Sequence, residues 1–205
     1  ISARVEDAVM DMSAGFAAAA RIEAPQARVT YDKFHVVSHL SKAVDEIRRA
    51  EHKALLAQDD ETLKGQRMLF LFNPENFSEE QAASFDLLLK SNLKAGQAWA
   101  FKELFANFWE QPDKESARIF IKKWCSRVKK TRLPALKAVA SMIERHLDGL
   151  LNYFISRLTN ALCEGFNSKI QQIKTAARGF RSFENYRTRI LFFLGDLDLS
   201  VRLSH

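Results

Sequence analysis

Hydrophobic and polar positions at the start of the chain predict a strand, a helix and a second strand. Residues 7–10 form a short apolar run, and residues 27–31 alternate apolar and polar side chains around two β-branched residues. Between them, an alanine-rich segment begins after Ser13, a helix-capping residue type, and ends before Pro25. Two strands joined by one helix are typical of a parallel βαβ unit.

This topology predicts that two aspartates lie at one edge of the sheet. Asp11 follows the first strand and Asp32 follows the second. The carboxyl ends of parallel strands meet at the same edge, which is where open α/β sheets bind their ligands. The sequence therefore predicts neighbouring carboxylates from positions that are far apart along the chain.

The chain after His35 predicts helices, so the expected fold class is an α/β start with a mostly helical remainder in one compact domain. Apolar residues recur three and four positions apart in four segments: Val37, Leu40, Val44, Ile47 and Leu55; Phe101, Leu104, Phe105 and Phe108; Phe120, Ile121, Trp124 and Val128; and Val139, Ile143, Leu147 and Leu150. Ser78 and Gln81 match a capping box, and Pro134 opens the last helix of this set. The helical spacing of the aromatic residues favours core packing over base stacking.

The net charge of +6 is unevenly distributed. Two stretches, 116–143 and 165–183, contain no acidic residue. Their bases include Arg118, Lys122, Lys123, Arg127, Lys129, Lys130, Arg132 and Lys137 in the first, and Lys169, Lys174, Arg178 and Arg181 in the second. A solvated helix face would explain either stretch alone, but two such stretches favour a nucleic-acid partner, because neutralised phosphates release counterions.

Other features narrow the class of protein. No apolar run is long enough to cross a bilayer, so no membrane partner is expected. Cys125 and Cys163 are isolated, which fits a reducing cytoplasm and predicts two core residues rather than a zinc site. No secretory signal stands at the start, and because the chain begins with Ile1 we expect that upstream sequence has been removed.

A late amphipathic helix over about 160–177 holds the remaining candidate carboxylate. One stripe of this helix is polar: Asn160, Glu164, Asn167, Gln171 and Lys174. Another stripe is apolar: Leu162, Phe166, Ile170, Ile173 and Ala177. Gly179 suits the end of the helix. Spacing alone is compatible with an ordinary solvated face.

Six ordered elements of the sequence resemble those of insertion-sequence transposases of the ISL-three group. They are D-M at 11–12, D-x-F-H-V at 32–36, V-D-x-x-R-x-x-E at 44–51, L-K-G-x-R at 63–67, N-x-x-x-E-G-x-N-x-K-I at 160–170 and G-F-R at 179–181. Each element alone is weak, but their order and spacing together are specific.

The resemblance implies a DDE transposase with a ribonuclease-H-like core. In such an enzyme, carboxylates hold two divalent ions, Mg²⁺ or Mn²⁺, for DNA strand cleavage and strand transfer. The implied partners are transposon-end and target DNA and further copies of the chain, and the implied location is the bacterial cytoplasm at the nucleoid. The expected division is a partial βαβ core at 1–36, a helical insertion at 37–156 and core-completing helices at 157–205.

The resemblance leaves two assignments of the catalytic and metal-binding carboxylates. In one, Asp11 takes the second position, Glu164 is the glutamate, and the first aspartate lies upstream of this chain, which is then inactive alone. Asp32 and His35 then form a D-x-x-H element. In the other, Asp11, Asp32 and Glu164 are the complete triad.

The supporting residues also have alternatives. Asp32 and His35 either orient DNA or metal, or simply cap a helix with a buried histidine. Asn160 and Asn167 orient Glu164, contact phosphate or are simply solvated. A rival function is a non-catalytic helical DNA-binding or assembly module, and a third is a helical scaffold without a nucleic-acid role.

Overall fold

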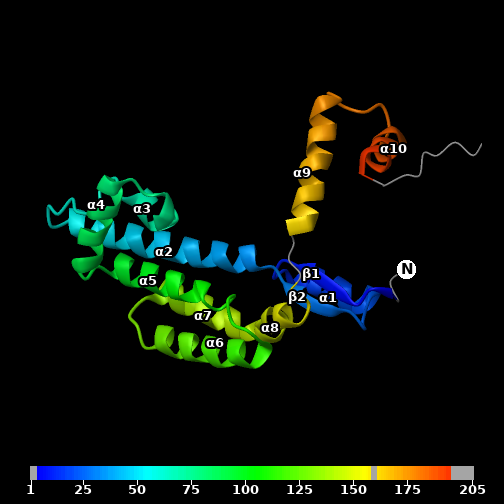
Figure 1. Cartoon of the computed structure of the whole chain (residues 1–205). Helices are drawn as coiled ribbons and strands as arrows, with labels where there is room; N and C mark the ends of the chain where they lie inside the picture. Colours follow the sequence, from blue (N-terminus) through cyan, green and yellow to red (C-terminus); the bar gives the residue numbers. More distant parts are fainter. Residues whose placement is uncertain (1–3, 158–160, 195–205) are drawn as a thin grey trace, which may run out of the picture. The chain divides into compact units, whose positions relative to one another are not determined.

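A computed structural model describes residues 4–157 and 161–194, with the backbone alone described for 161–167. The elements in chain order (Figure 1) are β1 (Asp7–Met10), α1 (Ala14–Glu23), β2 (Arg28–Tyr31), α2 (Lys33–Leu56), α3 (Arg67–Leu71), η2 (Pro74–Asn76), α4 (Glu79–Lys90), α5 (Lys94–Ala106), α6 (Lys114–Lys129), α7 (Pro134–Arg145), α8 (Leu147–Ser156), α9 (Ala161–Ala176) and α10 (Phe183–Leu194). They form two compact units, Ile1–Leu158 and Thr159–His205.

The first unit begins with the predicted parallel βαβ arrangement. Strands β1 and β2 pair in parallel, with Asp7 opposite Arg28 and Met10 opposite Tyr31. Thr30 is fully buried in β2, as expected for a β-branched residue on a packed strand. The α/β start and the mostly helical remainder are therefore confirmed.

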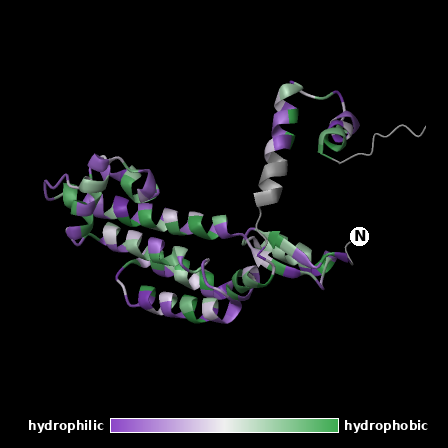
Figure 2. Ribbon diagram, in the orientation of Figure 1, coloured by the Kyte–Doolittle hydropathy of each residue, from purple (hydrophilic) through white to green (hydrophobic). Residues whose placement is uncertain are grey.

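Helix α2 is the long central helix of this unit and packs against α3, α5 and α7. Apolar and polar residues alternate along its length (Figure 2). Leu40, Val44 and Ile47 are buried as predicted, but Val37 is exposed. Val36 occupies the buried position one turn before Leu40, so the predicted stripe was wrong by one residue at its start.

Aromatic side chains fill much of the core between the helices. Phe105, Phe108 and Trp124 are buried and lie edge-on or tilted against one another. The indole Nε1 of Trp124 donates to the Phe101 carbonyl at 3.0 Å, which satisfies its one polar atom. The helical spacing of the aromatics therefore marked a core, as predicted.

The helix predicted from Pro134 through Leu150 is two helices. Helix α7 ends at Arg145, and His146, with φ −109° and ψ 15°, leaves the helical region before α8 begins. The ring Nδ1 of His146 lies 2.8 Å from the Met142 carbonyl and satisfies the end of α7. The break allows α7 to pack on α2 while α8 packs on β2.

Other local predictions are also resolved. Ser78 and Gln81 form the predicted capping box at the start of α4. Ser13 occupies the N-cap position of α1 without a side-chain capping bond. Cys125 is buried, and burial raises the pKa of its thiol to about 12, which agrees with a core residue. Cys163 lies outside the described side chains.

The second unit consists of α9 packed against α10. The described part of its predicted amphipathic pattern is confirmed: Ile170 and Ile173 are half-buried, whereas Gln171 and Lys174 are exposed. Gly179 adopts a φ of +113°, a conformation that suits glycine after a helix end. In the described part of the chain, no helix has the length and hydropathy needed to cross a membrane.

Candidate functional site

The end of the two-stranded sheet brings Asp11 and Asp32 together, as the sequence predicted. The amide of Asp32 donates to the Met10 carbonyl at 2.9 Å, so the ladder continues one residue beyond the paired strands. Adjacent strands lie about 4.8 Å apart in this direction. Asp11 and Asp32 are therefore neighbours across the sheet edge.

Asp11 contacts a histidine of the next motif. The Nδ1 of His35, in the first turn of α2, lies 3.3 Å from the Asp11 carboxylate, and the side chains are 42% and 40% exposed. The D-M element and the D-x-F-H-V element thus meet in space. Such a contact orients the carboxylate, and the Asp11 side chain stays partly exposed.

Asp32 has different surroundings. Its residue is only 3% exposed, and its Oδ1 has no hydrogen-bond partner. Asp32 stands at the N-cap position of α2, yet its side chain forms no capping bond. A buried polar atom without a partner is rare in folded proteins and costs about 1–3 kcal/mol, so such atoms are often found at functional sites.

Helix α8 packs against β2 and contacts the residues that precede Asp32. The Asn152 amide donates to the Val29 carbonyl at 2.8 Å. Gly149 approaches the ring of Tyr31 so closely that a Cβ there would clash with it. The Tyr31 ring also packs edge-on against His146, with 5.1 Å between the ring centroids. These contacts fix the residue that precedes Asp32.

A second histidine lies near this site. The rings of His35 and His39 are 5.5 Å apart. Desolvation, with added repulsion from His35 and Lys42, lowers the pKa of His39. Burial and the neighbouring positive charges therefore favour the neutral form of His39.

The predicted glutamate belongs to the other unit. Glu164 lies within α9, but its side chain and that of Asn167 are outside the described side chains, and Asn160 is outside the described residues altogether. Among the described residues, no group of three or more His, Cys, Asp or Glu is arranged to hold a metal ion.

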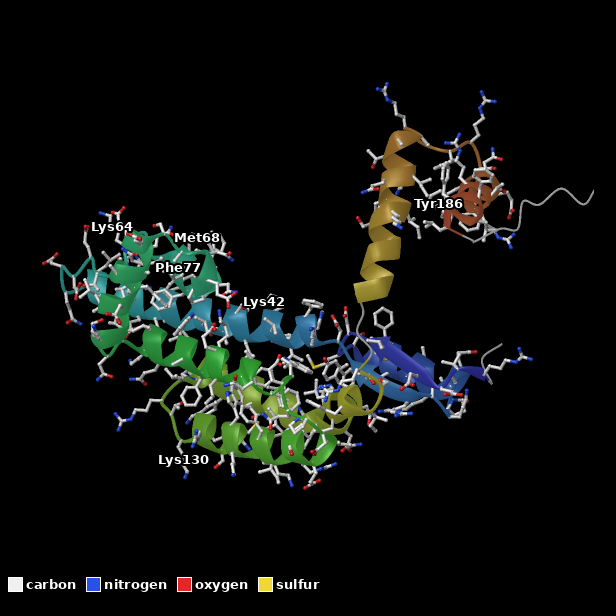
Figure 3. All side chains as sticks on the ribbon, in the orientation of Figure 1. Lys42, Lys64, Met68, Phe77, Lys130 and Tyr186 are labelled. Atoms are coloured by element: carbon white, nitrogen blue, oxygen red, sulfur yellow. The ribbon has the colours of Figure 1, made fainter. Side chains whose placement is uncertain are left out.

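The predicted basic residues lie on solvent-facing surfaces. Helix α6 buries Ala117, Ile121, Trp124, Cys125 and Val128 on one face. Its opposite face exposes Lys122, Lys123, Arg127 and Lys130, and Lys130 extends from the end of the helix (Figure 3). We call these four residues the α6 basic face. Within the described part of the chain, none of the four forms an ion pair, unlike Lys129, which contacts Glu144 at 2.6 Å.

Of the other predicted bases, Arg118 and Lys137 are half-buried, and Arg118 contacts Glu115 at 3.6 Å, whereas the rest are exposed. Arg132 lies in the connection between α6 and α7. In the second unit, Lys169 and Lys174 belong to α9, and Arg178 and Arg181 follow it.

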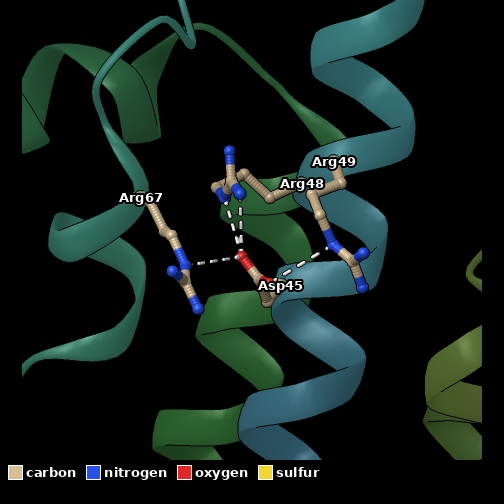
Figure 4. Close-up of polar contacts among 4 residues, drawn as sticks. All are labelled: Asp45, Arg48, Arg49 and Arg67. Carbon is tan, nitrogen blue, oxygen red and sulfur yellow. Dashed lines mark hydrogen bonds and ion pairs between the residues drawn. The ribbon is translucent and has the colours of Figure 1, made fainter.

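Sequence reasoning missed an aspartate–arginine cluster on α2. Asp45 Oδ1 accepts two hydrogen bonds from Arg48, at 3.1 Å from Nε and 2.8 Å from Nη2. Arg49 Nε lies 3.3 Å from the other oxygen, and Arg67 Nε lies 3.6 Å from Oδ1 (Figure 4). We call these four residues the Asp45 cluster. It joins the V-D-x-x-R-x-x-E and L-K-G-x-R elements, whose contact in space the sequence did not predict.

Glu51, the last residue of the same motif, has a structural role. Its two carboxylate oxygens accept from the backbone amides of Lys94 and Ala95, at 2.8 and 2.7 Å. These amides start α5 and lack partners within their own helix. Glu51 therefore caps α5 from α2 and is not free for chemistry.

Comparisons with known proteins agree with this arrangement of motifs. The family model of ISL-three-type DDE transposases, described as "Transposase", matches residues 1–190, and the chain belongs to this family. It is 27% identical over 190 residues to the transposase for insertion sequence element IS1001 of Bordetella parapertussis, covering 91% of this chain and 47% of that protein.

A second relative aligns with a smaller share of the chain. The transposase for insertion sequence element IS1557 of Mycobacterium tuberculosis is 28% identical over 184 residues, covering 77% of this chain and 40% of that protein. The chain thus spans less than half the length of these relatives. No solved structure matches the chain.

Proposed function

We propose that this chain is part of the catalytic region of an insertion-sequence transposase that cleaves and joins DNA strands by metal-dependent DDE chemistry. One observation carries the proposal. In a chain of the transposase family, two parallel strands bring Asp11 and Asp32 to one sheet edge, where one carboxylate is paired with His35 and the other has a buried oxygen without a partner.

In this proposal Asp11 is the second catalytic carboxylate and Glu164 is the glutamate. Asp11 is followed by a helix and another strand, which supports this by analogy with the ribonuclease-H fold and implies that the first aspartate is upstream. Exposure supports it too, because a metal ligand that works on DNA must be reachable by phosphates. Asp11 meets that requirement, whereas Asp32 is buried.

The donors at the sheet edge fit a divalent cation, because Mg²⁺ and Mn²⁺ prefer carboxylate oxygens. Asp11 and Glu164 would hold the ions, and Asp32 would join them if the triad is Asp11, Asp32 and Glu164. When bound, two such ions stabilise the charge that develops on the attacking and leaving oxygens. His35 holds the Asp11 carboxylate in one orientation, and α8 fixes the backbone before Asp32.

The α6 basic face would bind DNA phosphates. Its four side chains face solvent without neutralising partners among the described residues. The bases of 165–183 would do the same from the other unit. Such contacts contribute affinity and orientation but little sequence choice.

In this view 1–36 is a partial ribonuclease-H-like unit, 37–156 is a helical insertion, and 157–205 completes the core. The active complex would contain several copies of the chain together with transposon-end and target DNA.

The test uses the complete transposase that contains this chain. Asp11→Asn and Glu164→Gln are expected to abolish DNA cleavage with Mg²⁺ or Mn²⁺ and to leave DNA binding within about twofold, because neither residue is in the basic stretches. Asp86→Asn, an exposed carboxylate of α4, is the matched control and should keep full cleavage.

The same assignment predicts that the 205-residue chain alone does not cleave DNA. A Glu164-dependent nuclease activity of this chain would instead support the complete triad of Asp11, Asp32 and Glu164. If the complete protein binds DNA but never cleaves it, the α6 basic face would favour a non-catalytic DNA-binding module.

A further inference from the structure

We propose that Arg49 and Arg67, positioned by Asp45, form a phosphate-binding site for the DNA backbone. This site lies on α2 and at the start of α3, apart from the carboxylates of the sheet edge and from α6. The inference rests on the proposed function in one respect only, which is that the polyanion is DNA.

The charge balance of the Asp45 cluster carries the first step. Three guanidinium groups surround one carboxylate, so three positive charges meet one negative charge. No other carboxylate of the described residues forms an ion pair with these arginines. The cluster therefore keeps two positive charges that the protein does not neutralise, and like charges held close together favour an added anion.

The three arginines differ in burial, and this divides their roles. Arg48 has a side chain only 8% exposed and makes both hydrogen bonds to Asp45. It is the internal counter-ion of that carboxylate. Arg49 and Arg67 are 66% and 62% exposed. In the described structure neither donates a hydrogen bond to Asp45, so their N–H groups remain available to a ligand.

The geometry suits a phosphate. Arg49 comes from α2 and Arg67 from the start of α3, and both guanidinium groups point toward Asp45 from different sides (Figure 4). The planar guanidinium fork matches phosphate oxygens, and two forks held in advance lose little conformational entropy on binding. Lys42, one turn before Asp45 on α2, is exposed and adds a third cation nearby (Figure 3).

A purely structural role does not account for Arg49. Arg67 links the start of α3 to α2 through Asp45, which would stabilise the fold. Arg49, however, lies on the same helix as Asp45, so its contact joins no two elements. An exposed pair of this kind contributes only about 0–1 kcal/mol.

The exposure of this site favours a phosphate of a polymer as its ligand over a free small molecule. Sites for small ligands bury most of the ligand surface. Here the two arginines that would bind are each exposed over most of their side chains. An open pair of arginines fits a phosphodiester that other contacts along the duplex hold in register.

The experiment measures binding of the 205-residue chain to a fluorescent DNA duplex by anisotropy over a range of salt concentrations, with a chelator present. The double variant Arg49→Gln/Arg67→Gln is expected to bind about tenfold more weakly at low salt. The slope of log affinity against log salt should fall by about one to two, because each lost phosphate contact removes about 0.9. The chelator makes the result independent of any metal at the sheet edge.

Arg187→Gln is the matched control. Arg187 is 61% exposed, close to the exposure of Arg49 and Arg67, but it has its own carboxylate, Glu184, at 3.5 Å. It loses one positive charge, as each single variant of the site does, and should bind DNA like the wild type. Thermal unfolding checks the fold of each variant, and if the double variant unfolds, the single variants are each expected to bind about threefold more weakly.

Three results would overturn the inference in different ways. If the double variant binds like Arg187→Gln while Lys122→Gln/Lys123→Gln on α6 weakens binding, this site is wrong and the proposed function stands. If neither pair weakens binding, the proposed DNA role fails as well. If inorganic phosphate raises the melting temperature only when Arg49 and Arg67 are present, and DNA binding is unchanged, the site binds a free anion instead of DNA.

Discussion

Helix α2 has an aspartate at its N-cap and another in its middle, and the two lie in opposite surroundings. Asp45 is contacted by three arginines, one of them buried. Asp32 is more deeply buried, yet one of its carboxylate oxygens has no partner. If stability alone had shaped these sites, the more buried carboxylate, Asp32, would be the one with hydrogen-bond or ion-pair partners.

The difference indicates that structural residues and candidate catalytic residues occupy different parts of α2 and its N-terminus. Residues of V-D-x-x-R-x-x-E join elements of the fold: Asp45 contacts Arg67 at the start of α3, and Glu51 caps α5. The residues at the sheet edge, by contrast, leave polar atoms unsatisfied. A motif shared within a family therefore does not by itself identify the chemical site, whereas the pairing of its side chains does.

The largest expected effect is at the paired aspartate. Asp45→Asn leaves the buried Arg48 without its counter-ion and should lower the free energy of unfolding by about 3 kcal/mol or more, measured by urea denaturation. Asp86→Asn breaks an exposed pair with Lys90 and should lower it by less than about 1 kcal/mol. Equal, small losses for the two variants would mean that Asp45 does not hold the cluster together.

The next effect acts on the sheet edge through packing. Gly149→Ala would bring a Cβ into a clash with the Tyr31 ring, so the ring or α8 must shift. We expect a loss of about 1–3 kcal/mol in the free energy of unfolding. Gly15→Ala is the control, since its Cβ would meet only Ser13 Oγ at 3.7 Å within α1 and should stabilise by about 0.5–1 kcal/mol. A neutral Gly149→Ala would show that α8 does not fix the strand before Asp32.

A smaller effect, and in the opposite direction to Asp45→Asn, is expected at the unpaired aspartate. Asp32→Asn removes a buried charge whose Oδ1 has no partner, so the free energy of unfolding should stay within about 1 kcal/mol of wild type or rise. If Asp32 acts in catalysis, DNA cleavage by the complete transposase should nevertheless fall. A loss of stability as large as that of Asp45→Asn would refute the contrast between the two aspartates.

The smallest effect concerns pH. The pKa of His39 is lowered in the folded chain, so protonation favours the unfolded state. Its contribution to stability is complete above the unfolded pKa of 6.5 and is lost as pH falls through the lower folded value. His39→Gln should therefore match wild type in thermal unfolding at neutral pH and lose less stability on acidification. If the loss of stability on acidification is the same in both proteins, His39 does not contribute to it.

Local sequence determined much of the fold. The apolar run at 7–10, the alternation at 27–31 and the helical spacing after them predicted the elements, because backbone hydrogen bonding and side-chain period are local. The same reasoning predicted that Asp11 and Asp32 would be neighbours, since strand polarity alone determines which ends meet. It failed at His146, where the helix ends because α7 and α8 pack on different partners.

Tertiary structure alone decided which side chains from distant elements are paired. Arg67 meets Asp45, Glu51 meets the amides of α5, and Gly149 meets Tyr31 only after helices distant in the chain have packed. The single oxygen left without a partner at Asp32 is equally a result of that packing. The period of the sequence specifies the face of an element on which a residue lies, but the partner of that face depends on how the whole core is packed. The sequence therefore predicted the positions of the carboxylates and not the residues that surround them.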